Sequence, residues 1–500
     1  MQFSHFLVSL TTMILSLNYL LEGKYISKLH SISKRLPVMM FFGLFLLHVV
    51  GLFWSTDLAY GGHDVQIKLP ILALPIILGS SAKLTVKQFE WVLVFFIATS
   101  LVSSIVGSVI YFVLSQPGDD YRLMSPFMSH IRLSLMMGVA VFSSFYLSQR
   151  STQFQQFSGW LRGLGFWFII YLFMLRAMSG IVAVLAASLV LVWALTSNYR
   201  VKYSRWIKTG IIVFTVLTIG YVYYQVQEFY DIEELSLNTV DKHTKSGEEY
   251  TFDLDKKTFE NGHYTYSYIA INELRTEWNK ESKLDFDGAD LKGQSLQSTL
   301  IRYLTSKNLR KDKEGVAALT HLDVWAVENG IANERFLNEK SLNTMIYRYI
   351  WEVHNYSQGF NPQGNSLAQR FLFWKNGVEI LKENWLYGVG TGDVQLAYNE
   401  QYDKMPYEIM GKYRLRAHNQ FLTMGVTFGI FGLIYFLCTM FSGFWLTKNA
   451  KSYLFLGSFI ILMVSMLDED TLETQFGVTY AMFFYFLFLF HQPVSEEVVD

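Results

Sequence analysis

The sequence predicts an all-α integral membrane protein with about eleven membrane-spanning helices and one large polar insertion. Composition is the first observation behind this prediction: 51% of the 500 residues are hydrophobic and only 17% are charged, whereas soluble chains carry about 25% charge. The second is distribution, because long apolar runs fill the chain before residue 225 and after residue 420. Together they exclude a secreted or cytosolic enzyme and predict a chain that is embedded in the lipid bilayer.

The net charge of −1 argues against a nucleic-acid partner, which requires a basic excess. The first apolar segment has no Lys or Arg before it and no small-x-small cleavage site after it, so we expect a retained helix rather than a signal peptide. The single cysteine, Cys438, lies inside an apolar run. An internal disulfide and a cysteine-based metal site are therefore excluded.

The individual spans follow from the apolar runs. We expect membrane helices at residues 4–22, 37–54, 66–81, 90–115, 132–148, 158–175, 179–197, 206–225, 420–446, 452–467 and 474–491. The segment 66–81 gives the weakest signal, because it is short and contains Pro70 and Pro75.

Basic residues alternate between the short connections and assign the two sides of the membrane. Connections that end the odd-numbered helices contain about fourteen, against about four in the alternate connections. The rich set is Lys24, Lys28, Lys34, Arg35, Lys83, Lys87, Arg150, Arg162, Arg200, Lys202, Arg205, Lys208, Lys448 and Lys451, and the poor set is Lys68, Arg122, Arg132 and Arg176. The rich set is predicted to be cytoplasmic, which places the polar insertion outside.

The chain is accordingly divided into N-terminal transmembrane helices (1–225), an external loop (226–417) and three C-terminal transmembrane helices (418–500). Helical spacing of apolar residues such as Leu300 and Leu304 predicts a mostly helical loop. Near its end, Asn365 or Ser366 can cap a helix over residues 367–382.

This helix and the segment after it contain the candidate site residues. Arg370 and Trp374 share one face of the helix. Gly388, Gly390 and Gly392 then form either a glycine turn or a nest of backbone amides that approaches a phosphate.

Arg414, Arg416 and His418 come immediately before an apolar helix and are expected at the external membrane surface. Arginine presents a planar fork suited to phosphate oxygens. His418 is either a structural hydrogen-bonding group or a base. Arg176 lies in the shortest external connection, where a charge is costly unless it is paired, functional or reaches the lipid headgroups. Arg132 is equally ambiguous.

An acidic turn, Asp468 to Glu473, separates the last two helices. Its Asp-x-Asp pattern can hold a divalent metal in soluble sugar transferases, but no nucleotide-binding fold accompanies it here. Pairing with the nearby arginines or orientation of an acceptor is favoured, and no metal is predicted.

Three motifs together resemble the O-antigen ligase and polymerase superfamily of bacterial membrane glycosyltransferases. They are Arg370-x-x-x-Trp374, Gly388-Val389-Gly390-Thr391-Gly392-Asp393 and His418-Asn419-Gln420-Phe421-Leu422, followed by Gly425, Gly429 and Gly432. The stretches ELRTEWN and LIRYLTSKNLRKDKEG look like the Bacteroidota version. The resemblance implies a membrane glycosyltransferase C-like fold of about 11–12 transmembrane helices with a large periplasmic loop.

Members of this superfamily transfer a glycan from undecaprenyl diphosphate to an acceptor hydroxyl without cofactor or metal. The resemblance implies that His418 is the base or orients the acceptor, and that Arg370 holds the diphosphate. Met178 stands where the second family arginine is usual, so Arg176, two residues earlier, is its expected counterpart. Arg414 and Arg416 are added as diphosphate-binding residues. The supporting residues are Trp374, Gly388, Gly390, Gly392, Asn419, Asp468 and Glu473.

The predicted function is an inverting, metal-independent O-antigen ligase-like transfer of glycan to a lipid A core hydroxyl at the periplasmic face of the bacterial inner membrane. Guanidinium groups would stabilise the leaving diphosphate, and nearby arginines are expected to favour neutral His418. A repeat-unit polymerase or a protein O-oligosaccharyltransferase remains open, since the divergent loop determines the acceptor. A lipid-linked glycan transporter is a more distant alternative.

Overall fold

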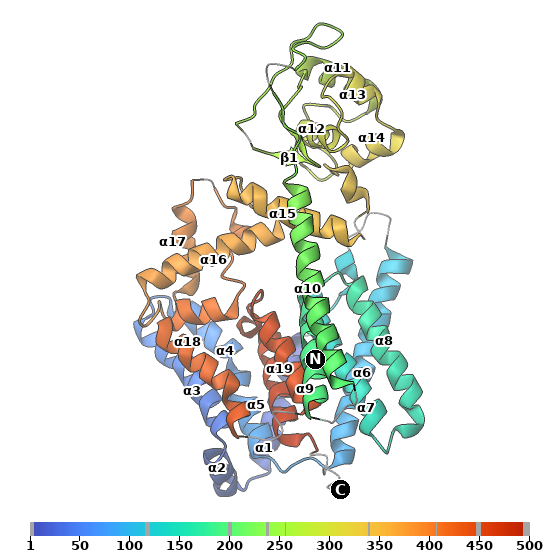
Figure 1. Cartoon of the computed structure of the whole chain (residues 1–500). Helices are drawn as coiled ribbons and strands as arrows, with labels where there is room; N and C mark the ends of the chain where they lie inside the picture. Colours follow the sequence, from blue (N-terminus) through green and yellow to red (C-terminus); the bar gives the residue numbers. More distant parts are fainter. Residues whose placement is uncertain are drawn as a thin grey trace. The chain divides into compact units, whose positions relative to one another are not determined.

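The computed structural model describes residues 5–115, 121–198, 203–236, 240–255, 257–338, 341–406, 408–446 and 452–493. Helices make up most of this part (Figure 1). The two strands within the described ranges, β1 (Phe259–Glu260) and β2 (His263–Tyr264), form one short antiparallel pair. The predicted all-α class is confirmed.

The eleven apolar segments predicted from the sequence are all helical. Those before the polar block correspond to α1 (His5–Leu21), α3 (Leu36–Val50), α5 (Leu69–Ser80), α6 (Val86–Val109), α7 (His130–Arg150), α8 (Ser158–Met174), α9 (Met178–Asn198) and α10 (Ser204–Phe229). Those after it correspond to α18 (Gln420–Leu446), α19 (Tyr453–Ser465) and α20 (Gln475–Phe486). Two further helices, α2 (Tyr25–Ser33) and α4 (Leu58–Ile67), were not predicted.

Seven helices in the described ranges are long and apolar enough to cross a membrane, or eight if the bent pair α1 and α2 is one span. This is fewer than the eleven predicted. The difference arises at α1, α5, α19 and α20, which contain 17, 12, 13 and 12 residues and so do not reach the roughly 20 residues of a straight span. The chain is a multi-span membrane protein on either count.

The chain divides into two compact units, unit 1 (residues 1–208 and 370–500) and unit 2 (residues 209–369). In unit 1, α7 packs against α8 and α9, α19 against α7 and α9, α20 against α5, and α3 against α5 and α18 (Figure 1). Helices from the two ends of the chain thus share one apolar core. The predicted boundaries at residues 225 and 417 concern the membrane and stay a prediction.

Unit 2 contains the short helices of the polar block. They are α11 (Ile271–Glu281), α12 (Leu296–Ser306), α13 (Lys313–Ala317), α14 (His321–Glu328) and α15 (Leu342–Ser357). The apolar face of α12, including Leu300 and Leu304, is buried against Trp278 and Phe286. The predicted amphipathic helix in this part of the loop is therefore present.

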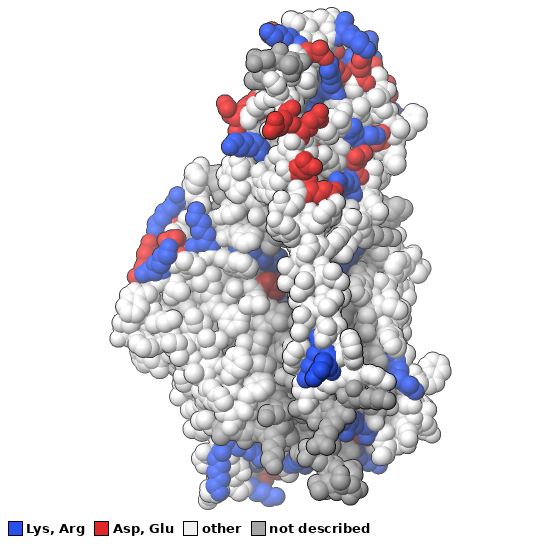
Figure 2. Space-filling model, in the orientation of Figure 1, with Lys and Arg blue, Asp and Glu red and all other residues white. Residues whose placement is uncertain are grey.

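Charged side chains are unevenly spread over unit 1. Figure 2 shows few of them over its helical part on the face drawn, whereas Lys and Arg occur at the end that carries α2, and Lys, Arg, Asp and Glu occur together at the opposite end, over α16 and α17. The predicted sides of the membrane stay a prediction. Arg200, Lys202, Lys448 and Lys451, which contributed to the prediction of sides, lie outside the described residues.

Candidate functional site

The acidic turn between α19 and α20 is held by the first residues of α18. The backbone N–H of Gln420 donates to Met466 O (2.9 Å), and the Gln420 side-chain oxygen accepts from the N–H of Leu472 (2.7 Å). The Asn419 side chain donates to Leu467 O (3.0 Å). These contacts bring His418 next to the turn, although about fifty residues separate them in the sequence.

Asp470 completes the junction, because it caps the start of α18. Its carboxylate accepts from the N–H groups of His418 and Asn419 (both 3.0 Å) and from the Thr423 hydroxyl (2.7 Å). His418 adopts φ 45° here, a left-handed conformation that non-glycine residues rarely adopt. Asp470 therefore fixes the backbone from which the imidazole projects.

The His418 imidazole lies between an aromatic ring and a carboxylate. It stacks on Phe373 from α16 (Ser366–Glu383), with centroids 5.6 Å apart. Its Nδ1 lies 3.5 Å from Glu469 Oε2, and 31% of the side chain is exposed. No hydrogen bond to Nε2 is seen within the described ranges, so this nitrogen can meet a substrate proton.

Glu469 also pairs with Arg370. The Arg370 Nη2 lies 3.3 Å from Glu469 Oε1, and its Nε donates to Asp468 O at 3.2 Å. One carboxylate thus joins the predicted base to the predicted diphosphate ligand. Arg132, whose role was left open, acts on Glu469 electrostatically.

The pKa of His418 is raised, which is opposite to the expected direction. Burial lowers the pKa of the imidazole, but the adjacent Glu469 and then Asp470 outweigh burial, while Arg370 only partly opposes them. Arg370 does favour the neutral ring, as expected, but the Glu469 and Asp470 charges outweigh it and the net shift is upward.

The other end of the turn forms a tight buried network. Glu473 Oε2 accepts from Lys68 Nζ at 2.8 Å and lies 3.1 Å from Arg416 Nη1, while Oε1 accepts from Gln420 at 3.0 Å. Lys68 is 1% exposed and also binds Asp64 at 2.7 Å. The predicted pairing of the acidic turn with nearby arginines is therefore seen at both of its ends.

The remaining predicted arginines lie elsewhere. Arg414 pairs with Asp403 (2.6 Å) at the end of α17 (Val394–Asp403), away from the contacts of the acidic turn. The guanidinium of Arg176 lies 5.1 Å from the ring centroid of Tyr121. Three residues later, the Ser179 hydroxyl donates to Asp468, so the first turn of α9, which follows Arg176, contacts the acidic turn.

The remaining predicted residues are Trp374, which lies on α16, and the glycine segment, Gly388 to Gly392. Trp374 packs edge-on against Phe371, and its buried Nε1 has no hydrogen-bond partner in the part of the chain that the structure describes. In the glycine segment, the amides of Val389 and Gly390 donate to Val426 O and Thr427 O (both 2.9 Å).

The last amide of this segment, that of Gly392, donates to the Ser55 hydroxyl (2.9 Å). These backbone N–H groups therefore already donate to acceptors within the protein and are not free to bind a phosphate. Of the two interpretations of the glycines, the glycine turn fits the structure. Gly388 (φ 67°) permits the close approach to α18, because a Cβ there would lie 2.4 Å from the Thr427 backbone.

Several residues of the site were not among the predicted ones. Lys68 and Asp64 were missed, although their spacing of four residues on a helix is the signal of a pair. Phe373, one turn after Arg370 and on the ring face of His418, had no distinguishing sequence signal. Glu469 was recognised only as part of the acidic turn.

The fold and the site define a multi-span, all-helical membrane protein in which a histidine, arginines and carboxylates meet at the start of a membrane helix. Residues 331–437 match the sequence model of the family described as O-Antigen ligase. This segment contains Arg370, the glycines at 388, 390 and 392, and His418, so the part of the chain that carries the candidate site is similar to the O-antigen ligase family. A search of curated proteins found no match.

Proposed function

We propose that the protein transfers a glycan from undecaprenyl diphosphate to a hydroxyl group of lipid A core, at the periplasmic face of the inner membrane. The observation that carries this proposal is the bridge through Glu469, which holds His418 and Arg370 side by side. A base and a guanidinium in one place are what glycan transfer from a diphosphate requires.

Arg370 is proposed to bind the donor diphosphate. The site contains nearly as many cations as carboxylates: Lys68, Arg132, Arg370 and Arg416 against Asp64, Asp468, Glu469, Asp470 and Glu473. An incoming diphosphate must therefore compete with Glu469 for Arg370. The 3.3 Å contact is long for a charge-assisted hydrogen bond, which favours such an exchange.

His418 is proposed to act as the general base. Its Nδ1 faces Glu469, which orients the ring and stabilises the imidazolium once it forms, as a carboxylate does for the histidine of a catalytic triad. Neutral Nε2 takes the acceptor hydroxyl proton as the hydroxyl oxygen bonds to the anomeric carbon. The bond to the diphosphate breaks on the opposite face, so the configuration inverts, and the diphosphate leaves with the bonding electrons.

The other arginines take different roles. Arg176 is proposed as a second diphosphate ligand, because Ser179, three residues later in the first turn of α9, contacts the acidic turn. Arg416 is buried against Glu473 and supports the turn. Arg414 is occupied by Asp403 and is withdrawn from the proposed diphosphate site.

The test is a reconstitution of the purified full chain with a lipid-linked glycan and three separate acceptors: lipid A core, a second lipid-linked unit and a Ser/Thr peptide. Transfer to lipid A core supports the ligase. Transfer only to one of the other acceptors would replace it with a polymerase or a protein O-oligosaccharyltransferase. Translocation of the lipid-linked glycan without transfer to any acceptor would indicate a transporter.

A further inference from the structure

Unit 2 contains a pocket that the proposed reaction leaves unused. Its volume is about 210 Å³. The lining comes from the segment around β2 and from the first turns of α12, and consists of Thr265, Tyr266, Ser295, Gln297, Ser298, Ile301 and Arg302. Hydroxyls, an amide, one aromatic ring and one guanidinium therefore share a single hollow.

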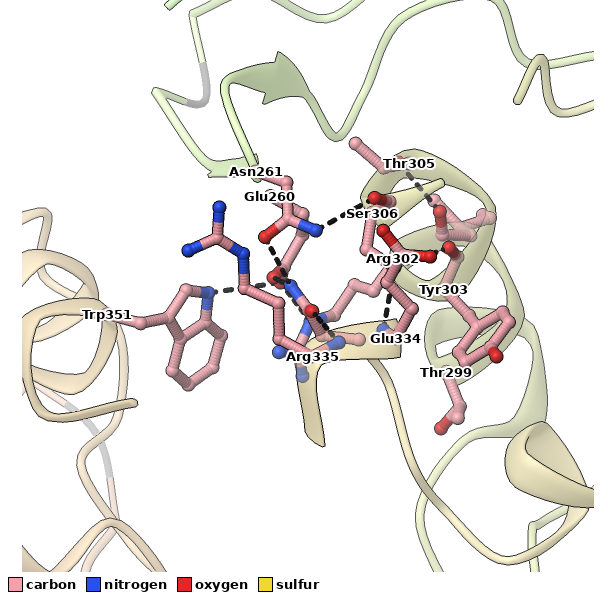
Figure 3. A network of polar contacts seen from close by, with 12 residues as sticks. Glu260, Asn261, Thr299, Arg302, Tyr303, Thr305, Ser306, Glu334, Arg335 and Trp351 are labelled. Atoms are coloured by element: carbon pink, nitrogen blue, oxygen red, sulfur yellow. Dashed lines mark hydrogen bonds and ion pairs between the residues drawn. The ribbon is translucent and has the colours of Figure 1, made fainter. Parts of the chain in front are cut away.

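Arg302, one of the lining residues, contacts a carboxylate and an aromatic ring. Its Nε donates to Glu260 Oε1 at 2.7 Å, and its guanidinium carbon lies 4.2 Å from the ring centroid of Trp351 (Figure 3). The Trp351 Nε1 donates to the same carboxylate oxygen at 3.0 Å. The salt bridge and the aromatic face hold the guanidinium in one plane, which lowers the entropy that binding would cost.

The carboxylate behind Arg302 is itself fully engaged. Glu260 is 1% exposed, and its second oxygen accepts from Asn333 at 2.7 Å and lies 3.5 Å from the Tyr347 hydroxyl. Such a buried carboxylate is costly to move. In the described part of the chain, no hydrogen bond to the two Nη groups of Arg302 is seen, so their donors are free of other protein groups.

We propose that this pocket binds one pyranose unit of the glycan that the protein transfers. Glu260 neutralises the charge of Arg302, so the pocket offers paired donors rather than a net positive field, and adjacent sugar hydroxyls accept such donors. Ser295, Gln297 and Ser298 add adaptable polar groups, and Tyr266 adds a ring for the apolar face of a sugar. The identity of the sugar rests on the proposed function.

Binding and transfer can be measured separately on the full chain in nanodiscs. The probe is the oligosaccharide released by mild acid from the lipid-linked donor, which lacks both lipid and diphosphate. Ser298→Trp fills the pocket from its exposed rim and leaves Glu260 and Arg302 in the sequence. Gln294→Trp introduces the same side chain at an exposed position outside the lining and serves as the matched control.

We expect Ser298→Trp to weaken oligosaccharide binding by roughly tenfold or more, seen by saturation-transfer NMR and calorimetry, and to raise the KM for donor with little change in kcat. Gln294→Trp should bind like the unchanged protein. His418→Ala should lose transfer and keep oligosaccharide binding.

Equal binding by the unchanged protein and Ser298→Trp, or no binding by either, would overturn this inference while leaving the proposed transferase untouched. Ser298-sensitive binding in a chain that transfers to none of the three acceptors would overturn the transferase and keep the pocket as a sugar site.

Discussion

A glutamate pairs with basic side chains at each end of the acidic turn, but the two glutamates differ in burial and in the length of their contacts. At one end, Glu473 is 5% exposed and contacts Lys68, Arg416 and Gln420 at 2.8 to 3.1 Å. At the other end, Glu469 is 19% exposed and contacts Arg370 and His418 at 3.3 and 3.5 Å. Glu473 is thus buried and makes short contacts, whereas Glu469 is more exposed and makes longer contacts.

This difference separates structure from chemistry within one turn. A buried carboxylate loses several kcal/mol of hydration and is retained only with close partners, as at Glu473. Glu469 is more exposed and has longer contacts, so its basic partners can bind a ligand instead at a lower cost in free energy. We therefore propose that Glu473 stabilises the fold of the junction, and that Glu469 is the carboxylate with which the substrate competes for Arg370.

The largest effect is expected from Glu473→Gln. This change leaves Lys68 and Arg416 without their shared charge and should destabilise the folded chain by about 3–5 kcal/mol. Thermal unfolding in detergent, followed by light scattering and circular dichroism, measures the loss. Glu469→Gln is the matched control and should cost less, because the contacts of Glu469 are longer and its side chain is more exposed than that of Glu473. Equal losses in the two variants would remove the distinction between the two ends.

Arg370→Ala should lower the rate of glycan transfer by about 10²–10³-fold, because a donor aimed at the developing charge is lost. Arg414→Ala is its control: the partner Asp403 is exposed, so an ion pair of little energy is removed and transfer should stay within about twofold. The measurement is initial transfer rate at saturating acceptor. Similar losses in both variants would return Arg414 to the diphosphate site.

Gly390→Ala should destabilise the chain by roughly 1–3 kcal/mol. Gly390 has φ 89°, and a Cβ would lie 2.5 Å from the Ser55 hydroxyl and 2.8 Å from Gly51 O. Gly62→Ala, in a helix with open space around it, is the control and should be neutral or slightly stabilising. Wild-type stability in Gly390→Ala would contradict the structural role of the glycine segment.

Glu469→Gln should shift the pH dependence of transfer. His418 must be neutral to act, so the rate rises as pH passes upward through its pKa, which is raised above 6.5 in the unchanged protein. Without the Glu469 charge, burial and Arg370 lower this pKa, although Asp470 and Asp468 still oppose them. The acidic limb of the rate profile should therefore move to lower pH, and an unmoved limb would argue that another group titrates.

Much of the fold follows from local signals in the sequence. Apolar runs located all eleven helical segments, and the predicted cap at Asn365 or Ser366 located the start of α16, which begins at Ser366. The span count was less secure, because length in the sequence does not show where a helix breaks. For example, α5, α19 and α20 contain 12, 13 and 12 residues and are shorter than the apolar runs that predicted them.

The site was predictable as a set of residues and not as a set of contacts. Arg370, His418 and the acidic turn were all identified, but which carboxylate meets which cation depends on packing between distant segments. Lys68 and Glu473 are 405 residues apart. The direction of the His418 pKa shift and the engagement of the glycine amides depended on the same long-range contacts.

The central claim, that the Glu469 end of the acidic turn carries the chemistry, is tested most directly by single-turnover transfer with His418→Ala in the reconstituted full chain. We predict a loss of at least about 100-fold in rate, with thermal stability and binding of lipid-linked donor close to those of the unchanged protein. Exposed His63→Ala, as the control, should transfer normally. Transfer at the unchanged rate by a folded His418→Ala protein would contradict the account.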